Sequence, residues 1–428
     1  MVRRPCLHLC WTALVYSLFL FPASHGNLYS DRQHAPPKDG VDWDNFGFSL
    51  NGVETDAMWV DKVLVGKEYF SSNEKRNLQP MGTLQISPAA TVLNYGQALF
   101  EGLKAFRRQD GSIALFRPES NAQRMQQGAE RFLLPTVPTD VFVQAAEHVV
   151  RANSRWIPPM GKGALYLRPI LIGTGAALGV APSHEATFCI YGSPVGNYFK
   201  GDLKPIRLQA VRGYSRASPG GTGAVKASGN YAPAFLVQKQ IKARGYDEAL
   251  CLDAVTGECV EEAGQSFLFF TYSNAPHWQE PIVSFLLLLT TGASNFFAYF
   301  AHNKTLVTPS LDTLTILPGV TRQSIMELAQ IECGCTVLER RLTLIELREA
   351  DEAFCCGTGA VITPVGCVSV LGKDGEETEV IQFGDGETGP MTRTLFDMLT
   401  GIQSGSNAEL AIKYSHWIKI VEPHYKAS

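Results

Sequence analysis

The sequence predicts an α/β protein of two domains, and three observations support this fold class. The chain has 428 residues, which is more than a single hydrophobic core usually serves. Short apolar runs typical of strands alternate with amphipathic helical patterns along the chain. The pattern is interrupted at residues 198–201, and we place the domain boundary there, between a smaller domain over residues 41–202 and a larger domain over residues 203–428.

The composition is that of an ordinary globular protein, with 45% hydrophobic and 18% charged residues. The net charge of −4 and the pI near 6.2 provide no general basic surface for nucleic acid, so we expect a small-molecule partner. The ten cysteines are scattered, and the close pairs at 333/335 and 355/356 lack the spacing of zinc ligands. We therefore expect no metal site, and mostly buried thiols in a reducing compartment.

The first 26 residues differ from the rest of the chain in composition. Two arginines precede an apolar run over residues 11–21, small residues follow, and no acidic residue occurs before Asp31. This layout is typical of a secretory signal peptide, whereas the lack of acidic residues also fits an organellar transit peptide. The apolar run is short for a membrane span, so we expect no stable one. We leave residues 1–26 out of the fold and interpret residues 27–40 as a linker.

Strand and helix patterns alternate in the smaller domain. Strand-like runs occupy residues 57–60, 84–86, 165–172 and 187–191. A helical pattern opens at Ser87 and continues as far as Leu103. Two further helices are predicted to begin at Pro118 and at Thr139.

The larger domain also mixes helices and strands. A helix follows Tyr231 and ends at Gly245, since glycine commonly terminates helices. Two strands at hairpin spacing come next, joined by a turn at Thr256 and Gly257. The strands are predicted over residues 249–253, 258–262, 336–341, 353–356 and 360–364, and the later helices over residues 321–330, 344–349 and 390–402.

One lysine of the larger domain has an unusual sequence context. Lys226 lies between a glycine cluster at residues 220–223 and Gly229, and Asn230 and Tyr231 follow it. A lysine at its usual pKa is protonated and a poor nucleophile, so a lysine that forms a Schiff base must lie among small residues and be partly desolvated. By itself the pattern also fits a glycine-rich surface loop with a solvated lysine, so its meaning depends on the rest of the chain.

Several motifs occur in the order found in one enzyme family. They are Asn94-Tyr95-Gly96, Phe100-Glu101-Gly102, Tyr166-Leu167-Arg168-Pro169, Lys226 with Asn230-Tyr231, Glu261-Glu262, Leu317-Pro318-Gly319-Val320-Thr321-Arg322, Gly357-Thr358-Gly359 and His416-Trp417. On these motifs the chain, from about Asp42 to Val421, closely resembles the branched-chain-amino-acid aminotransferases, a class IV family of pyridoxal-phosphate enzymes. The resemblance implies the two-domain fold type IV, with a small N-terminal α/β domain and a larger C-terminal domain built on a mixed sheet or barrel. It also implies a homodimer.

The resemblance implies pyridoxal 5′-phosphate as the cofactor. Lys226 would be the catalytic residue, which binds the cofactor's aldehyde and moves the proton at the substrate α carbon. Glu262 would keep the ring nitrogen protonated, and the alternation of side chains along a strand would leave Glu261 facing solvent. A helix start at Thr321 would receive the phosphate. The implied cofactor-binding residues are Arg124, Lys226, Tyr231, Glu262, Leu317, Gly319, Val320, Thr321 and Thr358.

The resemblance also implies a substrate pocket. Its residues would be Tyr95, Phe100, Tyr166, Arg168, Tyr198, Gly359 and Ala360. Aromatic rings suit a branched aliphatic side chain, and Arg168 suits the distal carboxylate of glutamate, because one pocket must accept both substrates. The implied function is reversible transfer of the amino group between leucine, isoleucine or valine and 2-oxoglutarate, as in branched-chain amino-acid biosynthesis. The preferred substrate and the biosynthetic or catabolic direction stay open.

Two alternatives to this function remain open from the sequence. One is another enzyme of the same fold, a D-amino-acid aminotransferase or an aminodeoxychorismate lyase, which would share the cofactor motifs. The other is an inactive homologue that acts as a binding or structural protein, because residues 265–292 interrupt the motif that follows Glu262.

The interrupting segment 265–292 differs from its surroundings in composition. Deleting it joins Gly264 to Ala293 and gives one strand-turn-strand unit, so we interpret it as unspliced or wrongly assigned sequence. A real surface excursion is the alternative, since a longer loop costs little free energy. For the location we expect an organelle, mitochondrion or plastid, by resemblance, and the secretory route is the alternative.

Overall fold

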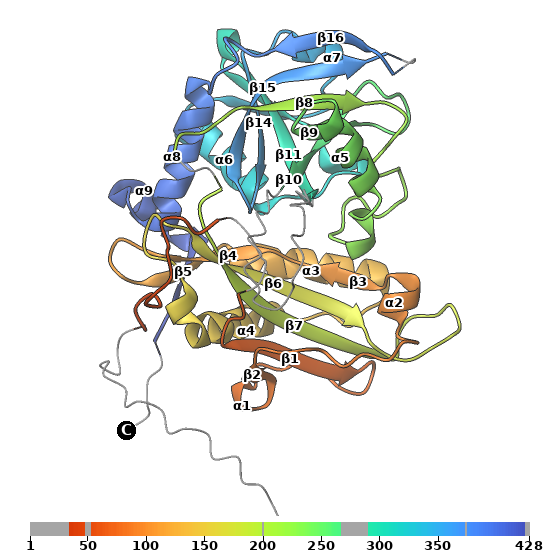
Figure 1. Cartoon of the computed structure of the whole chain (residues 1–428), viewed down its shortest axis with the longest axis vertical. Coiled ribbons are helices and arrows are strands. Elements are labelled where there is room, and N and C mark those ends of the chain that lie inside the picture. Colours follow the sequence, from red (N-terminus) through yellow and green to blue (C-terminus); the bar gives the residue numbers. More distant parts are fainter. Residues whose placement is uncertain (1–33, 48–52, 199–200, 267–289, 373–374, 424–428) are drawn as a thin grey trace, which may run out of the picture.

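The computed structural model describes residues 34–47, 53–198, 201–266, 290–372 and 375–423. These residues form two bodies built on separate β-sheets, which follow one another along the long axis of the molecule (Figure 1). The expected signal or transit peptide lies outside the described residues, as does most of the segment 265–292.

The smaller body contains an eight-stranded sheet with the order β17-β5-β4-β6-β7-β1-β2, in which β3 also pairs with β6. Its strands are β1 (Ala57–Leu64), β2 (Leu78–Pro80), β3 (Ala98–Phe100), β4 (Leu103–Arg107), β5 (Ile113–Phe116), β6 (Ala164–Gly173), β7 (Glu185–Val195) and β17 (Ile418–Val421). Helices α3 (Pro118–Phe132) and α4 (Thr139–Ala152) begin where the sequence predicts. They cover the sheet and share one core with it, which includes Trp59 and Phe188.

The larger body contains a nine-stranded sheet. Its strands are β8 (Ile206–Val211), β9 (Glu248–Leu252), β10 (Val260–Ser266), β11 (Thr290–Phe300), β12 (Thr305–Thr308), β13 (Thr336–Glu339), β14 (Glu352–Gly357), β15 (Val361–Leu371) and β16 (Glu377–Gln382). Strand β10 pairs with β9 and also with β11, so the strands β10, β9, β8, β15, β14 and β11 close into a barrel. Parallel and antiparallel pairs both occur, which confirms the expected mixed sheet and fold class.

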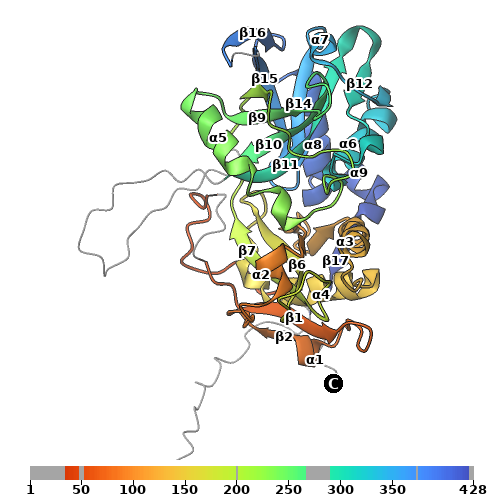
Figure 2. The same ribbon diagram turned by 90° about the vertical axis from the view of Figure 1, so that its right-hand side faces the viewer.

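Helices surround this barrel (Figure 2). They are α5 (Ala234–Ala243), α6 (Val320–Ile331), α7 (Leu344–Leu347), α8 (Pro390–Ser404) and α9 (Ala408–Lys413). Helices α6 and α8 pack on each other and on β14, around the fully buried rings of Phe297 and Phe354. The N-terminus of α6 is thereby held at the end of the barrel that faces the smaller body (Figure 1).

The predicted helix from Ser87 to Leu103 is wrong. A helix forms only over α2 (Thr91–Tyr95), and it ends at Gly96, whose φ of +66° lies in the left-handed region. The following leucines belong to β3 and β4, where they pair with β6 and are buried in the core. A spacing of four residues places side chains on one face of a helix and also on one face of a strand. The pairing with β6 therefore determines that these leucines form strands. The short helix α1 (Glu74–Asn77) was not expected either.

The last strand of the chain does not follow the expected domain boundary between residues 202 and 203. Strand β17 belongs to the smaller body, where it pairs with β5 in the register Ile418–Phe116 to Val421–Ile113. Helices α8 and α9 precede it on the larger body. The chain therefore returns to the smaller body at its end.

Strands β10 and β11 form a hairpin whose tip carries the unusual segment. Glu262 lies opposite Asn295, and Gly264 lies opposite Ala293, in antiparallel register. The two residues that deletion of 265–292 would join are therefore already cross-strand neighbours.

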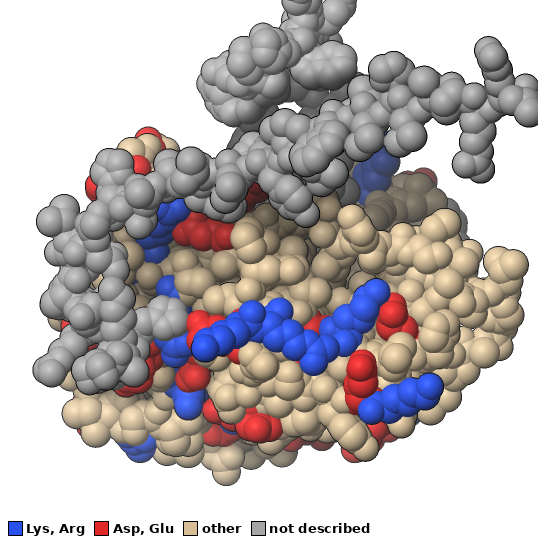
Figure 3. Space-filling model, turned by 90° about the horizontal axis from the view of Figure 1, so that it is seen from below, with Lys and Arg blue, Asp and Glu red and all other residues tan. Residues whose placement is uncertain are grey.

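The surface agrees with the near-neutral composition. On the face of the smaller body seen from below, acidic side chains lie beside the row of Lys and Arg side chains (Figure 3). None of the helices in the described residues is long and apolar enough to cross a membrane. The described cysteines are all free thiols, and no group of His, Cys, Asp and Glu that could hold a metal ion occurs in this part of the chain.

Candidate active site

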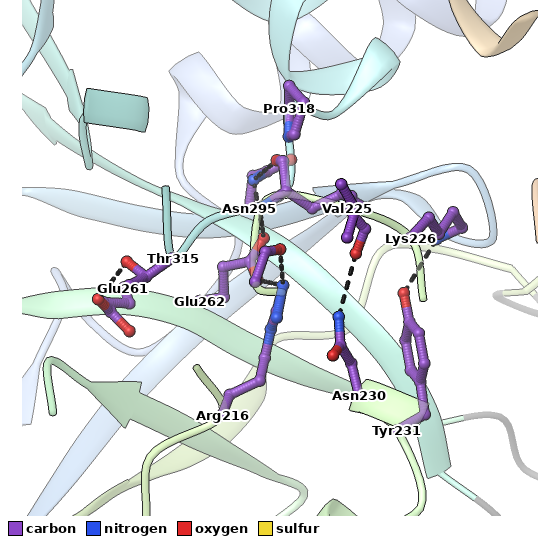
Figure 4. Close-up of polar contacts among 12 residues, drawn as sticks. Arg216, Val225, Lys226, Asn230, Tyr231, Glu261, Glu262, Asn295, Thr315 and Pro318 are labelled. Atoms are coloured by element: carbon purple, nitrogen blue, oxygen red, sulfur yellow. Dashed lines mark hydrogen bonds and ion pairs between the residues drawn. The ribbon is translucent and has the colours of Figure 1, made fainter. Parts of the chain in front are cut away.

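Lys226 lies where the larger body meets the smaller one. Its carbonyl oxygen accepts a hydrogen bond from the backbone N–H of Phe100 at 3.1 Å, and Leu99 and Ala227 form an isolated antiparallel bridge. A hydrogen bond within the loop also stabilises the backbone around the lysine: the side-chain amide of Asn230 donates to the carbonyl of Val225 at 3.0 Å (Figure 4). These contacts fix the backbone on both sides of the lysine.

The amine of Lys226 is desolvated. Its Nζ donates to Tyr231 Oη at 3.3 Å (Figure 4). The same atom lies 4.7 Å from the centre of the Phe100 ring. Burial lowers the pKa of Lys226 to about 7, and the charge of Arg124 acts in the same direction. Burial also raises the pKa of Tyr231, so the phenol keeps its proton at neutral pH. A large share of the amine is therefore neutral and nucleophilic near pH 7.

Glu262 faces the same space from the barrel. It is 1% exposed, and its Oε1 accepts hydrogen bonds from Asn295 Nδ2 at 3.1 Å and from the Leu317 N–H at 3.0 Å. Its Oε2 forms an ion pair with Arg216 (Figure 4). Burial raises the pKa of Glu262, whereas Arg216 and the Leu317 N–H act in the opposite direction. The carboxylate is thus held in one orientation, close enough to Lys226 for each charge to shift the other's pKa.

The start of α6 forms an anion-binding end of the site. Gly319 is its N-cap and supplies no side-chain capping bond, so the first-turn N–H groups of Val320 and Thr321 have no intrahelical acceptor. Val320, Thr321 and Thr358 line one small hollow. A Cβ atom at Gly319 would lie 2.0 Å from Asn295 Oδ1, so the close approach requires glycine here.

Arg124 reaches this end from the smaller body. Its Nε and Nη2 donate to the two carboxylate oxygens of Glu101 at 2.8 and 2.7 Å, and its Nη1 donates to the Pro318 carbonyl at 2.9 Å. Asn121 donates to the same carboxylate at 2.7 Å. These bonds use three of the five N–H groups of Arg124, and the remaining two can bind an anion. The Arg124 guanidinium holds the pKa of the buried Glu101 carboxyl below its usual value, against the opposing effect of burial.

The predicted substrate side is aromatic and carries one arginine. The Phe100 ring meets the Tyr231 ring edge to face at 4.9 Å, and the guanidinium carbon of Arg168 lies 4.7 Å from the Phe100 ring and 5.5 Å from the Tyr166 ring. Arg168 forms no ion pair with any Asp or Glu of the described chain. Its charge is therefore available to a carboxylate that comes from outside.

Tyr198, Gly359 and Ala360 line a second part of this region. They share a cavity of about 390 Å³ with residues of α8, and no acidic residue contributes to its lining. Lys104 donates from β4 to the Gly359 carbonyl at 2.5 Å, and burial lowers the pKa of Lys104 to about 7. The smaller body thus holds the turn between β14 and β15 in place.

Tyr95 is the one predicted site residue that lies apart from the others. It is 42% exposed at the end of α2, and its Oη donates to the Leu178 carbonyl. Among the described residues it makes no hydrogen bond or ring contact with Lys226, Phe100 or Arg168. Within one chain, the structure does not bring Tyr95 to the amine.

The expectation that Glu261 faces solvent is wrong. Glu261 does point to the other side of β10 from Glu262, as strand alternation requires, but it is only 6% exposed. Its Oε1 accepts a hydrogen bond from Thr315 Oγ1 at 2.5 Å (Figure 4). The loop before α6 covers it, and a sequence pattern does not reveal such a cover.

Four residues of the site did not emerge from the sequence, namely Arg216, Asn295, Glu101 and Lys104. Arg216 lies in a loop without a periodic pattern, and Asn295 is separated from Glu262 by the unusual segment. Glu101 belongs to one of the family motifs, but no local pattern indicates that it pairs with Arg124.

Comparison with known proteins decides the family. Residues 98–367 match the sequence model of the amino-transferase class IV family. The chain is 43% identical to branched-chain-amino-acid aminotransferase 3, chloroplastic, of Arabidopsis thaliana over 366 residues, which cover 85% of this chain and 78% of the relative. The chain belongs to the class IV aminotransferases, in the branched-chain group. This aminotransferase is also 41% identical to branched-chain-amino-acid aminotransferase 1, mitochondrial, of the same plant. The match covers 86% of this chain and 84% of the relative.

A solved structure agrees with this assignment. The branched-chain aminotransferase of Thermoproteus uzoniensis with norvaline is 25% identical to the chain, and the TM-score is 0.63 over 86% of this chain and 99% of the other. The fold of the two proteins is the same, which confirms fold type IV.

Class IV aminotransferases depend on pyridoxal phosphate, and the residues of this aminotransferase fit that cofactor. Lys226 would offer a desolvated amine to the aldehyde, and Glu262 would offer a fixed carboxylate to the ring nitrogen. The α6 N-terminus offers first-turn amides to the phosphate across a cradle that a Cβ at position 319 would fill. Arg124 adds two N–H groups at the same end.

Proposed function

We propose that this aminotransferase reversibly transfers the amino group between leucine, isoleucine or valine and 2-oxoglutarate. The observation that carries the proposal is the position of Arg168 against two aromatic rings, near enough to the desolvated amine of Lys226 to affect its pKa. An apolar wall with a single cation suits both a branched aliphatic side chain and the distal carboxylate of glutamate.

The chain's own residues divide the work. Lys226 moves the proton between the substrate α carbon and its own Nζ, which a pKa near 7 permits in both directions. Glu262, fixed by Asn295, Leu317 and Arg216, stabilises positive charge on the cofactor ring. Pyridoxal phosphate supplies, when bound, the aldehyde and the ring that accepts electrons. The turn at Gly359, held by Lys104, offers backbone amides to the substrate's α-carboxylate.

A substrate panel tests the proposal. We expect turnover of L-leucine, L-isoleucine and L-valine with 2-oxoglutarate and none of D-leucine. Arg168→Met should raise the KM for glutamate by about 100-fold and that for leucine by less than about 3-fold, since only glutamate carries a distal carboxylate. Turnover of D-amino acids instead, or an equal effect on both KM values, would overturn it. Borohydride reduction followed by mass analysis should place a pyridoxyl group on Lys226.

A homodimer is supported by an exposed apolar patch on the smaller body. Leu178 and Val180 are 86% and 88% exposed, and Tyr95 lies beside them because its Oη donates to the Leu178 carbonyl. Such patches mark protein interfaces. We infer that a second copy covers this patch and that Tyr95 lines the partner's substrate pocket. Replacing Leu178 and Val180 by aspartate should give a monomer in light scattering and impair leucine turnover.

An organellar location is supported by several plant relatives whose names give a chloroplastic or mitochondrial location. The acid-free first 26 residues fit such a destination. Fusing residues 1–40 to a fluorescent protein would test it. Fluorescence in the endoplasmic reticulum would contradict the proposal.

A further inference from the structure

The hairpin turn between β14 and β15 carries a strained residue. Gly357 pairs with Val361 at the end of the hairpin, and residues 358–360 form the turn. Val361 has a φ of +68°, in the left-handed region. Five non-glycine residues of the described chain have a positive φ, and Val361 is the only β-branched one among them. Valine rarely adopts this conformation, and hairpin turns usually place glycine or asparagine at such a position.

A strained backbone of this kind persists only where its surroundings hold it. Two hydrogen bonds join this turn to the smaller body. Lys104 Nζ donates to the Gly359 carbonyl at 2.5 Å, and Thr358 Oγ1 donates to the Gly102 carbonyl at 3.3 Å. Adjacent residues of the turn are therefore attached to the start of β4.

The position of Lys104 is itself fixed. It lies on β4 opposite Tyr166 of β6, and it is only 8% exposed. Burial lowers the pKa of Lys104 to about 7. The charged and the neutral amine both carry N–H groups, so the bond to Gly359 does not require one protonation state. Lys104 also borders the cavity of about 390 Å³ that Gly359 and Ala360 line, so a change at Lys104 reaches the active site through the turn.

We propose that Lys104 is a positioning residue for the α-carboxylate of every substrate. Its bond to the Gly359 carbonyl keeps Val361 in the left-handed region and thereby keeps the amides of the turn directed into the site. This role rests on the proposed function, in which the turn binds the α-carboxylate. Each amino acid and each 2-oxo acid of the reaction carries that group, so Lys104 affects the binding of all of them equally.

Kinetics separate this role from that of Arg168. Lys104→Met removes the donor with little change in volume, and it should raise the KM values for leucine and glutamate equally, by about 10-fold. The kcat should change by less than about 3-fold, because the α-carboxylate is bound in the ground state and in the transition state alike. Arg168→Met should instead act on the KM for glutamate.

Arg108 provides the matched control. It follows β4, and its Nη1 donates to the carbonyls of Ile402 and Gln403 on α8 at 3.0 and 3.1 Å. Arg108→Met therefore removes bonds between the two bodies that do not involve the turn, and it should change both KM values by less than about 2-fold. An equal rise of KM in Arg108→Met and Lys104→Met would overturn the proposal, because it would show a general loosening of the two bodies.

A double-mutant cycle with residue 361 distinguishes the position of the turn from the charge of Lys104. Asparagine adopts the left-handed region more readily than valine, so Val361→Asn should depend less on the bond from Lys104. The ligand is 4-methylvalerate, which is leucine without its ammonium group, and calorimetry on the holoenzyme measures its Kd. Lys104→Met should raise this Kd about 10-fold in the wild-type background and only about 3-fold in the Val361→Asn background. Equal rises in both backgrounds would show that only a charge is lost, and would overturn the proposal.

The double variant also serves if Lys104→Met alone does not fold. It should then bind 4-methylvalerate within about 3-fold of Val361→Asn, and weaker binding, or failure of both variants to fold, would overturn the proposal. The binding measurement involves no turnover. Inactivity toward leucine with binding that depends on Lys104 would therefore count against the proposed function alone. Turnover of leucine with unchanged binding in Lys104→Met would count against the role of Lys104 alone.

Discussion

Arg216 and Glu262 form an ion pair inside the barrel end, with the Glu262 side chain 1% and the Arg216 side chain 10% exposed. The arginine stands in the loop after β8 and the glutamate on β10, so the pair joins two segments on which the cofactor-binding residues depend. Burial raises the pKa of Glu262, and Arg216 opposes this effect, so the arginine favours the ionised carboxylate.

Replacing Arg216 tests this pair. Arg216→Met should reduce kcat by about 100-fold, because the pKa of Glu262 then rises further and less of the carboxylate is ionised to stabilise charge on the ring. The acidic limb of the pH–rate profile should move to higher pH. Arg212→Met, an exposed arginine in the same loop, is the control and should leave the profile unchanged. An unshifted acidic limb in Arg216→Met would contradict this role.

The pKa of Lys226 predicts how the cofactor-free protein responds to pH. The folded amine has a pKa of about 7, and an unfolded lysine has a pKa of about 10.4, so the unfolded chain binds more protons between these values. At pH values below those at which the unfolded thiols titrate, the free energy of unfolding should therefore rise with pH from about 7 upward. Lys104 also has a pKa of about 7, so Lys226→Met should remove about half of the slope. Urea unfolding at several pH values measures it, and an equal slope in the variant would refute the assignment.

The bond between Glu101 and Arg124 predicts a change in the response to cofactor. Glu101→Gln leaves the buried Arg124 charge without its partner and should destabilise the cofactor-free protein by about 3 kcal/mol. The phosphate dianion can replace the lost charge, so the rise in Tm on adding pyridoxal phosphate should be larger than in wild type. Glu119→Gln, at an exposed position of α3, is the control. An equal rise in Tm for Glu101→Gln and wild type would show that Glu101 does not balance the charge of Arg124.

The hairpin register predicts the result of deleting residues 265–292. Gly264 and Ala293 already face each other across β10 and β11, so in the deletion variant these two residues become the turn of a hairpin. The pairs Ala263–Ser294 and Glu262–Asn295 can then keep their register. We expect the deletion variant to fold and to transaminate leucine at least as fast as the full chain. Activity lost on deletion would contradict this expectation. A peptide map of the natural protein that covers Trp278 would establish that the segment is translated.

Much of the fold could be predicted from local patterns. The helices from Pro118 and Thr139, the two long strands of the smaller body, and the hairpin of β9 and β10 all carry strong periodicity or clear turn residues. The helix expected after Ser87 failed because leucines four apart fit more than one structure, and pairing with β6 decides among them.

The site was only partly predictable, for a different reason. Lys226, Tyr231, Glu262 and the start of α6 belong to motifs, and the structure places them around one space. The partners Arg216, Glu101 and Asn295 follow from tertiary contacts between distant segments, which no local pattern contains. The burial of Glu261 has the same origin, since Thr315 reaches it from another loop.

The pairing of β17 with β5 has a consequence for synthesis. The ribosome synthesises the chain from its first residue to its last. Strand β5 therefore cannot pair with β17 until translation has passed Val421. The N-terminal sheet is thus completed only after the whole barrel has emerged. Premature termination near the end of the message would leave an open sheet edge on the first-made body, a known template for aggregation.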